Sequence, residues 1–435
     1  MSPADGTLDT KSVQRLVERQ SDVRTLMPTR RMRRLSGVAG IVVLATTLAA
    51  CGGTSNSPSG TDSQQSGPAG QTSATPAPPD PVSLNANVKN GASKVKVDTL
   101  VTVSASLGTL TKVTLSYTNK DRQGRTQRGT VAGKINKDRT RWTASDRLEP
   151  AAMYKLTSVG RNTANQANTV TTSFSTQRLT LAEQTYPTLY PLKGSHVGVG
   201  MPVIVTFDVP VKNRREFEKN LHVTSSPAQV GSWHWYHSRE VRFRPRNYWR
   251  PGTKVTVAVN INGLNAGGGI YGQLSKKTHF TVGRSMITKI NLSSDVAKVY
   301  RNGKFVRRIY VSGGKPGWQT RSGTKLIMDK LYTHRMTNQM IGAREDYDLR
   351  VKYAMRITSS GEFLHAAPWN AGHFGRRNAS HGCVGMSTGD ASWLFRRTLI
   401  GDPVVTTGTS RGVEHGNGYS DWNISYAQYK KGSAL

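Results

Sequence analysis

The chain has 435 residues, of which 36% are apolar, 60 are Lys or Arg and 26 are Asp or Glu, so its formal charge is +34. This length is too great for one ordinary core and predicts two to four domains, while the abundant Gly and Pro favour β-rich domains with many turns. The basic residues are scattered and no nucleic-acid recognition motif accompanies them. Such a charge could imply a nucleic-acid partner, but the scatter and the missing motif argue against one, and an anionic surface such as a cell envelope is favoured.

The N-terminal region has the pattern of an export signal. Four arginines between Arg30 and Arg34 precede an apolar run from Leu35 to Ala50 that is too short to span a bilayer comfortably. The run ends in Leu48-Ala49-Ala50-Cys51, which resembles a bacterial lipobox, where cleavage precedes a cysteine that receives lipid. We expect residues 1–50 to be removed, with Met27 or Met32 as alternative starts, and Cys51 to anchor an extracytoplasmic protein to the membrane. The alternative is an uncleaved short anchor with an incidental cysteine.

Residues 51–81 are Gly, Ser, Thr, Gln and Pro with almost no apolar side chain, so we expect a disordered tether. Cys51 and Cys383 are the only cysteines, which in an exported protein would suggest one disulfide. If Cys51 carries lipid, Cys383 is left as a free thiol, and this indicates a chemical role for it.

Two consecutive segments, residues 82–178 and 179–284, alternate apolar and polar side chains as strands do. Phe174 in the last strand of the first segment corresponds to Phe280 in the second, so the segments are interpreted as two immunoglobulin-like sandwiches. We expect them to act as a spacer, since folded domains extend reach linearly. Trp233 to His237 form an aromatic cluster that could bind sugar rings, but a strand in a hairpin core is the favoured interpretation.

The third domain is predicted for residues 285–410, followed by a packing segment at 411–435. Asn302-Gly303 between two alternating runs predicts a hairpin with a type I′ turn. A long irregular stretch is expected from Gly313 to about Arg350. Ser387 with Asp390 predicts the start of a short helix that ends near Thr398. The tail is expected to pack on this domain through Trp422 and Tyr426.

The sequence Ser380-His381-Gly382-Cys383 carries the clearest chemical signal, together with His365 before it. Acyl transfer by sulfur needs a thiolate, a base and backbone N–H groups aimed at the developing oxyanion. Cys383 can supply the nucleophile, His365 the base, and the peptide groups around Gly382 and Cys383 the oxyanion donors. A buried inert cysteine and an unrelated histidine are the alternative interpretation.

The His, the gap and the Ser-His-Gly-Cys motif resemble the L,D-transpeptidases of bacterial peptidoglycan. Ala367-Pro368-Trp369 and Asp421-Trp422-Asn423 also resemble the branch with N-terminal immunoglobulin-like domains. The resemblance covers roughly residues 90 to 430 and implies a mainly β chain: two immunoglobulin-like β-sandwiches, then a β-rich catalytic domain with a short helix. It implies a flap over the donor site between Gly313 and Arg350. The implied catalytic set is Cys383, His365, His381 and Gly382, and the implied substrate-binding set is Tyr347, Ser360, Gly361, Ser380 and Gly385.

Two positions depart from the family pattern. Gly385 stands where many relatives carry Asn or Arg, so a side-chain contact to the substrate is missing. Ala366 stands where some carry Ser, which is tolerable because only its carbonyl is needed to orient His365. The motif does not fix the roles of the Ser380 and His381 side chains.

The resemblance implies a reaction without a cofactor or metal. Cys383 would attack a tetrapeptide stem at its diamino acid, D-alanine would leave, and a side-chain amine of a second stem would resolve the thioester into a cross-link. Carbapenem-type β-lactams are expected to acylate Cys383. Two alternatives remain open: an L,D-carboxypeptidase with water as acceptor, and a basic wall-binding lipoprotein whose catalytic domain has decayed.

Overall fold

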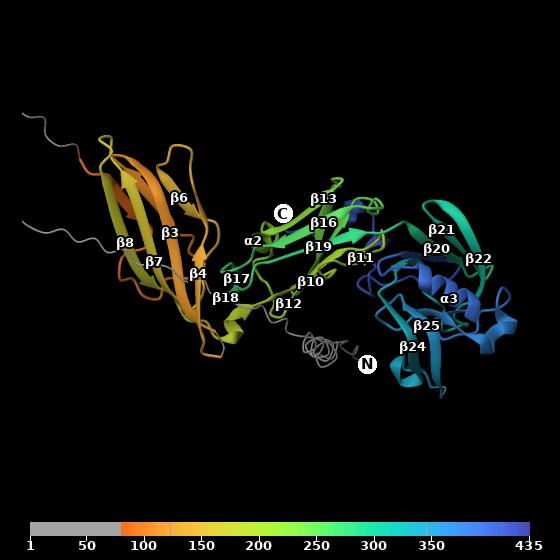
Figure 1. Ribbon diagram of the computed structural model, residues 1–435. Coiled ribbons are helices and arrows are strands. Elements are labelled where there is room, and N and C mark those ends of the chain that lie inside the picture. The colour runs from red at the N-terminus through yellow and green to blue at the C-terminus, as the bar shows by residue number, and fades with distance from the viewer. Residues whose placement is uncertain (1–79, 122, 345) are drawn as a thin grey trace, which may run out of the picture. The chain divides into compact units, whose positions relative to one another are not determined.

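The computed structural model describes residues 80–121, 123–344 and 346–435 (Figure 1). The predicted signal of residues 1–50, the lipidation site Cys51 and nearly all of the predicted tether lie outside the described residues. Within the described ranges strands dominate and helices are few and short, so the prediction of a mainly β chain is confirmed. No helix in these ranges is long and apolar enough to cross a membrane.

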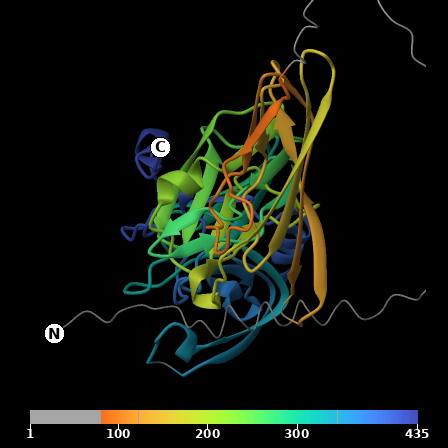
Figure 2. The same cartoon turned by 90° about the vertical axis from the view of Figure 1, so that its left-hand side faces the viewer.

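The first sandwich consists of two four-stranded antiparallel sheets, ordered β1-β2-β6-β5 and β4-β3-β7-β8. Alternation builds its core: Tyr154 and Leu156 of β7 are buried while Lys155 between them is exposed. The Tyr154 ring stacks on Phe174 at 5.1 Å. The strands, of which the longest are the orange and yellow arrows of Figure 2, are β1 (Ser83–Ala86), β2 (Thr102–Ser106), β3 (Thr109–Lys120), β4 (Thr126–Val131), β5 (Gly133–Ile135), β6 (Arg141–Ala144), β7 (Met153–Arg161) and β8 (Ala167–Ser175).

The second sandwich pairs the sheets β10-β12-β15-β14 and β11-β19-β16-β13, and a three-stranded sheet β17-β18-β9 accompanies them. Its core extends from Leu189 to Val282. Its elements are η2 (Leu181–Glu183), β9 (Gln184–Thr185), β10 (Pro187–Tyr190), β11 (His196–Val197), β12 (Val203–Phe207), α2 (Arg214–Glu218), β13 (Leu221–Ser226), β14 (Gly231–His237), β15 (Glu240–Pro245), β16 (Lys254–Val259), β17 (Asn265–Gly267), β18 (Ile270–Gly272) and β19 (Lys276–Val282).

The predicted aromatic strand is β14, which pairs with β15 in this sandwich. Trp233 and Trp235 are only 7% and 6% exposed, and the Trp235 Nε1–H donates to Glu218 Oε2 at 2.8 Å. The favoured interpretation as a hairpin core is therefore confirmed, and these two rings are closed to a sugar.

The third core, between Met286 and Val404, lies on one nine-stranded mixed sheet with the order β23-β28-β20-β21-β22-β27-β26-β25-β24. Helix α3 buries Ala391 and Leu394 in this core against β25 and β26. The elements are β20 (Met286–Asn291), β21 (Val296–Arg301), β22 (Lys304–Ser312), β23 (Gly323–Leu326), β24 (Asp329–Thr337), η3 (Asn338–Met340), β25 (Asp348–Arg356), β26 (Phe363–Ala366), η4 (Pro368–His373), β27 (Val384–Met386), α3 (Thr388–Arg397) and β28 (Pro403–Thr407).

Two local predictions in this domain are confirmed. Strands β21 and β22 form the hairpin, and Asn302 and Gly303 both have positive φ, 48° and 81°, as a type I′ turn requires. The Ser387 side chain accepts a hydrogen bond from the Asp390 N–H and caps α3, which ends at Arg397 with Thr398 as its C-cap.

The expected irregular stretch from Gly313 to Arg350 is wrong in part, because it contains β23, β24 and the start of β25. Strands β24 and β25 form a long antiparallel hairpin that pairs Asp329 with Arg356 at its base and Thr337 with Asp348 near its tip. The exposed part of β24 carries polar side chains on both faces, so no apolar alternation announces it. The backbone hydrogen bonds to β25 define this strand instead.

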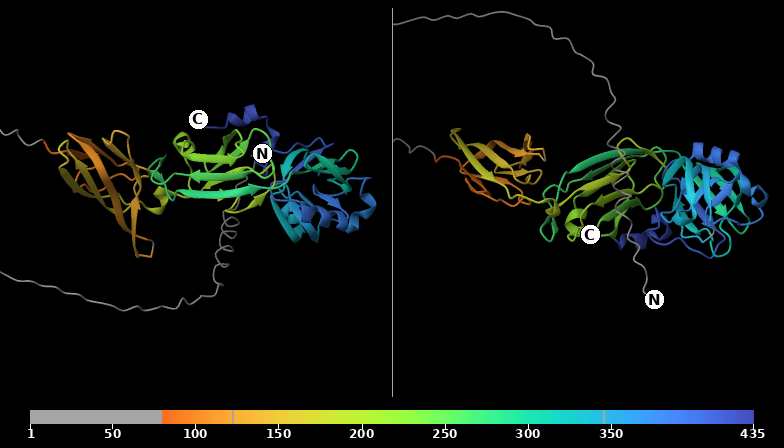
Figure 3. Two further views of the ribbon diagram at one scale, coloured as in Figure 1. Left: turned by 45° about the horizontal axis from the view of Figure 1, so that its top comes forward. Right: turned by 90° about the horizontal axis from the view of Figure 1, so that it is seen from below.

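The C-terminal segment, residues 411–435, packs largely on the second sandwich rather than only on the catalytic domain. It contains η5 (Asp421–Asn423) and α4 (Tyr426–Lys430), and both views of Figure 3 show its dark blue ribbon beside the green strands. The Trp235 N–H donates to Gly432 O at 2.9 Å, and the hydroxyl of the buried Tyr429 donates to Arg242 O at 3.1 Å. Trp422 and Tyr426, which were expected to pack on the catalytic domain, instead lie at Arg244 of β15, 4.5 Å and 5.6 Å from its guanidinium. The buried cations of β15 need the acceptors and aromatic faces that this segment provides.

Candidate active site

His365 lies on β26, a short strand with four buried residues. Its side chain is 6% exposed, and Nδ1 lies 2.8 Å from the carbonyl oxygen of Ala366, so Nδ1–H donates to that oxygen and Nε2 is left for chemistry. Burial lowers the pKa of His365 below its ordinary value of 6.5. A neutral imidazole at neutral pH can accept a proton, as a general base must.

Cys383 lies in the turn that leads into β27. The Ser380 hydroxyl donates to Cys383 O at 2.6 Å and accepts the Gly382 N–H at 3.1 Å, while the Thr320 hydroxyl donates to Gly382 O at 2.8 Å. Gly382 has φ +120°, a conformation that other residues rarely adopt. These contacts fix the backbone on both sides of the thiol, and they engage one of the two N–H groups predicted for the oxyanion.

The Cys383 thiol is free and half-buried, and it donates to the carbonyl oxygen of Gly361 at 3.7 Å. Burial raises its pKa to about 12, and a backbone hydrogen bond from Phe363 opposes this effect only in part. The resting sulfur is therefore a neutral thiol, and the imidazole must remove its proton when it reacts.

Strand pairing brings the two side chains to one pocket. Strands β26 and β27 are parallel neighbours, with His365 opposite Gly385. Cys383 lies in the turn directly before β27, two residues before Gly385, so this pairing brings it close to His365. The side chains of His365 and Cys383 line the same cavity, while the hydrogen bond of the thiol goes to Gly361.

That cavity has a volume of about 510 Å³ and gathers nearly all the residues that the sequence predicts for the site. Apolar side chains of the β24–β25 hairpin form part of its wall, including Met336 and Met340. Of the predicted residues, those that line it are Tyr347, Ser360, Gly361, His365, Ser380, His381, Cys383 and Gly385. Gly382 does not line it and contributes through the backbone of the turn.

Aromatic contacts hold His381 in the wall of the cavity. Its ring stacks on Tyr347 at 5.3 Å and meets the Trp318 ring edge-on at 5.3 Å. Trp369, which is 51% exposed, stacks over His365 at 6.1 Å. His381 thus has a packing role, and Trp369 forms part of the rim above the base.

The Gly385 departure has a structural counterpart. A Cβ atom at this position would lie 2.9 Å from the Cβ of the buried Ala367, so the backbone packing leaves little room for a side chain. The Ala366 carbonyl orients His365 as expected.

Sequence reasoning missed a buried charged cluster below the pocket. Glu362 is 3% exposed, and its carboxylate accepts hydrogen bonds from Arg321 at 3.0 Å and from Lys325 at 3.2 Å. Glu362 stands three residues before His365, but no local spacing connects it to cations about forty residues upstream. It also missed Asn417, which binds Ser360. In the described part of the chain no group of three or more His, Cys, Asp or Glu could hold a metal ion.

Comparison with known proteins defines the class. A family model for bacterial Ig domains matches residues 92–265, and one for the L,D-transpeptidase catalytic domain matches residues 286–406. L,D-transpeptidase 2 of Mycobacterium tuberculosis is 34% identical over 81% of this chain and 85% of its own length, and L,D-transpeptidase 5 of that organism is 31% identical over 70% and 68%. The chain belongs to the L,D-transpeptidase family.

Two solved structures of L,D-transpeptidases are similar to part of the chain. The structure of the L,D-transpeptidase LdtMt1 in complex with imipenem is 33% identical and covers 51% of this chain and 97% of its own, with a TM-score of 0.45. The structure of L,D-transpeptidase 3 from Mycobacterium tuberculosis with a faropenem-derived adduct is 29% identical and covers 51% and 97%, with a TM-score of 0.43.

Proposed function

We propose that this member of the family cross-links peptidoglycan stem peptides through their diamino-acid residues, with Cys383 as nucleophile and His365 as base. One observation carries the proposal: a neutral, oriented imidazole on β26 and a thiol in the turn directly before the parallel strand β27 line one cavity of about 510 Å³. A cavity of this size accommodates a short peptide stem.

In the first half-reaction His365 Nε2 takes the thiol proton as Sγ attacks the carbonyl carbon of the third stem residue. The new C–S bond forms, and the C–N bond to D-alanine breaks. The D-alanine amine leaves with the proton held by His365. Because the Gly382 N–H donates to Ser380, we assign oxyanion stabilisation in this step to the Cys383 N–H.

In the second half-reaction the side-chain amine of another stem attacks the thioester carbon. His365 takes a proton from this amine, the C–S bond breaks, and the proton passes to the leaving sulfur. The thiol is restored and a new amide bond joins the two stems. Water in place of the amine would give a carboxypeptidase.

We assign donor binding to the cavity wall made by Tyr347, Ser360 and Gly361. The peptide groups at Ser360 and Gly361 lie on the Cys383 side of this wall, as the contact of Gly361 O with the thiol indicates. Ser380 and His381 support the wall through the turn and the stacked rings. Gly385 contributes no side chain, so the donor would be held there by shape alone.

We also propose that Cys51 carries lipid and holds the enzyme on the outer side of the membrane, facing the cell wall. The support is the lipobox sequence that ends in Cys51. A mature N-terminus at Cys51 with the mass of a lipid, found in the membrane fraction, is expected. A soluble protein with another N-terminus would overturn this part of the proposal.

The same thiol should be acylated by carbapenem-type β-lactams, because their strained amide presents an acyl carbon to the nucleophile. The expected result is one adduct in the intact mass of the protein. Cys383→Ala should abolish it, whereas Cys51→Ser, which removes the other cysteine, should retain it.

The deciding experiment incubates the purified full chain with a soluble tetrapeptide stem and analyses the products. Dimer with released D-alanine supports the proposal, tripeptide monomer indicates a carboxypeptidase, and no product indicates a decayed wall-binding protein. Cys383→Ala should lose activity by orders of magnitude, as should His365→Ala, because nucleophile and base act as a unit. Cys51→Ser is the matched control and should remain active on soluble stems.

A further inference from the structure

The wall of the cavity next to Cys383 is a tight turn between β25 and β26, residues 358–362, here called the donor turn. Gly361 has φ +98° and its N–H donates to Thr358 O at 3.4 Å. A Cβ at Gly361 would meet only the Ile341 side chain within 4 Å, and Ser360 is exposed. The tip of the donor turn therefore has little packing of its own to fix its position.

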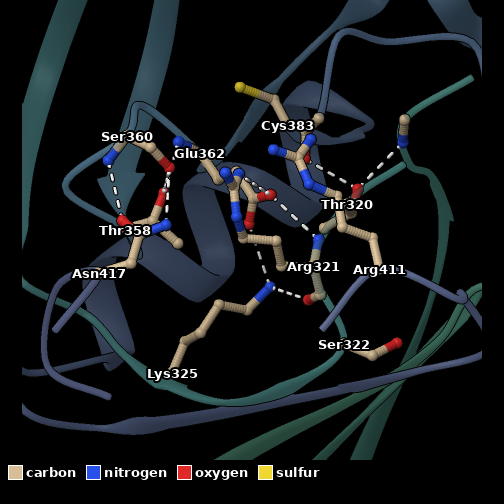
Figure 4. Close-up of polar contacts among 12 residues, drawn as sticks. Thr320, Arg321, Ser322, Lys325, Thr358, Ser360, Glu362, Cys383, Arg411 and Asn417 are labelled. Atoms are coloured by element: carbon tan, nitrogen blue, oxygen red, sulfur yellow. Dashed lines mark hydrogen bonds and ion pairs between the residues drawn. The ribbon is translucent and has the colours of Figure 1, made fainter. Parts of the chain in front are cut away.

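A residue from the C-terminal segment holds this tip. The Asn417 side chain accepts the Ser360 N–H at 3.0 Å and donates to Ser360 Oγ at 2.9 Å (Figure 4). An amide that binds both the backbone and the side chain of one residue fixes its position and its orientation. The same Nδ2 atom also donates to Glu414 Oε2 at 2.7 Å.

Glu414 connects Asn417 to the buried charges below the donor turn. Arg321 donates through Nε to Glu414 Oε2 at 2.5 Å and through Nη1 to Glu362 Oε1 at 3.0 Å. Burial alone would raise the pKa of the Glu414 carboxyl, but hydrogen bonds from Arg321 and Asn417 outweigh it and hold the pKa at about 2.

Glu362 is the inner anchor of the donor turn. Its carboxylate binds Arg321 and the fully buried Lys325 (Figure 4). Together with Glu414, which also binds Arg321, two carboxylates balance two cations across the cluster. Its N–H donates to Thr358 Oγ1 at 2.9 Å. The turn is thus held from inside through Glu362 and from outside through Ser360, and Arg321 and Glu414 join the two attachments.

The second sandwich fixes the segment that carries Asn417. Arg242 of β15 donates through Nη1 to Gly418 O at 3.0 Å and to Asp421 Oδ2 at 3.1 Å, and Asp421 is fully buried. Gly418 directly follows Asn417 in the chain. The position of the Asn417 side chain is therefore set by a strand outside the catalytic domain.

We propose that Asn417, supported by Glu414 and by Arg242 of the second sandwich, is a positioning residue that holds the donor turn in place to receive the stem peptide. The proposal rests on the proposed function, since it takes Ser360 and Gly361 as donor-binding. Loss of Asn417 should weaken donor binding and leave the Cys383–His365 chemistry intact, because neither side chain contacts it.

The chain offers a matched control on the same segment. Asn423 accepts the Thr324 N–H at 2.7 Å and donates to Thr324 O at 2.5 Å, so it also binds one residue at two points. Its partner lies on β23, and the hydrogen bonds of the Asn423 side chain go to Thr324 and Ser420 rather than to the donor turn. Asn417→Ala and Asn423→Ala therefore remove the same kind of contact from the same segment at different places.

The experiment measures donor kcat and KM, the rate at which iodoacetamide alkylates Cys383, and thermal unfolding for the full chain and both variants. Loss of both hydrogen bonds to Ser360 in Asn417→Ala should lower kcat/KM for the donor about tenfold, chiefly through KM. Its alkylation rate should stay within about twofold of wild type because the thiol environment is unchanged. Asn423→Ala should keep the kcat/KM of the wild type. An unchanged kcat/KM in Asn417→Ala, or an equal loss in Asn423→Ala, would overturn the proposal.

Hydrogen exchange separates this proposal from the proposed function. Amides of residues 358–362 should exchange about tenfold faster in Asn417→Ala than in Asn423→Ala, whether or not the wild type makes cross-links. If exchange is faster in Asn417→Ala but the wild type makes no product, Asn417 still positions the donor turn while the proposed cross-linking function is wrong. Equal exchange rates in the two variants would show that Asn417 does not fix the position of the donor turn.

Discussion

The indole N–H of Trp422 donates to the carbonyl oxygen of Gly200 at 2.8 Å, across 222 residues of sequence. Arg244 of the second sandwich lies over the rings of Trp422 and Tyr429, at 4.5 Å from each. The two domains also exchange backbone hydrogen bonds, from the Gly198 N–H to Ile400 O at 2.7 Å and from the Gly200 N–H to Gly401 O at 3.0 Å. The second sandwich is therefore in direct contact with the catalytic domain, and we predict that it supports this domain as well as acting as a spacer.

Removing the first sandwich should affect activity much less than removing both sandwiches. Residues 179–435 should keep the activity of the full chain on soluble stems, whereas residues 285–435 should lose most of it and unfold at lower temperature. The second deletion leaves the buried Asp421 without Arg242, and breaking such a pair costs about 3–5 kcal/mol. Activity and thermal unfolding are measured for both fragments and for residues 80–435. Equal activity of all three would restore the spacer interpretation.

The reactivity of Cys383 should follow pH as that of a neutral thiol. With a thiol pKa of about 12 and a His365 pKa below 6.5, the free enzyme carries neither charge at neutral pH. Alkylation by iodoacetamide should keep rising through about pH 8.5, the ordinary thiol pKa, without levelling. Transpeptidation should decline as falling pH protonates His365, below about pH 6.5.

The assay uses the Cys51→Ser protein, so that only Cys383 can react. His365→Gln should remove the decline at low pH from the residual rate. A plateau of the alkylation rate near neutrality would instead reveal a thiolate–imidazolium pair and contradict the prediction.

Local patterns predicted the parts of the fold that depend on neighbouring residues. The alternation of apolar and polar residues predicted the sandwich strands, Asn302-Gly303 predicted the hairpin, and Ser387 predicted the helix cap. Each of these signals reflects an interaction within a few residues. The Cys383 and His365 motif could also be recognised from the sequence, since His365 has a fixed place on β26 and Cys383 a fixed place directly before the adjacent strand β27. The sequence does not predict β24, because its side chains show no alternation of apolar and polar residues. Its pairing with β25 defines it as a strand.

The support around the site depends on contacts between distant segments, and these leave no local signal. Arg321, Glu362 and Glu414 meet across 41 and 93 residues, and Asn417 reaches Ser360 across 57. Each of these residues is of a type that is common at the protein surface, so none stands out in the sequence. Only the fold shows that they form one attachment below the pocket.

Gly385 should tolerate a side chain only if Ala367 makes room. A Cβ at Gly385 would lie 2.9 Å from the Ala367 Cβ, closer than such atoms pack, so Gly385→Ala should destabilise the protein by about 1–3 kcal/mol. The double variant with Ala367→Gly should recover most of this loss. Urea unfolding measures the free energy of unfolding for both. A destabilised double variant would show that the strain has another source.

Asp402 should make the protein less stable as the pH rises. Its carboxyl is 1% exposed; Oδ2 accepts the Leu399 N–H at 2.7 Å, whereas Oδ1 has no hydrogen-bond partner among the described residues. Burial raises its pKa to about 7, with the cations Arg284 and Lys330 opposing in part. The folded protein therefore holds a proton on Asp402 that the unfolded chain releases at about pH 4, and stability from this group falls as pH rises between those values.

Asp402→Asn removes the titrating group and keeps an acceptor for the Leu399 N–H. Its free energy of unfolding relative to wild type should therefore increase from about pH 4 to about pH 7 and then level, in urea titrations at several pH values. Glu414→Gln is the control of opposite sign, because the Glu414 pKa is lowered to about 2. The stability that the Glu414 carboxylate contributes is present above about pH 4.5 and is lost as the pH falls toward 2. A difference between Asp402→Asn and wild type that stays constant with pH would mean that Asp402 ionises at its ordinary pKa despite its burial.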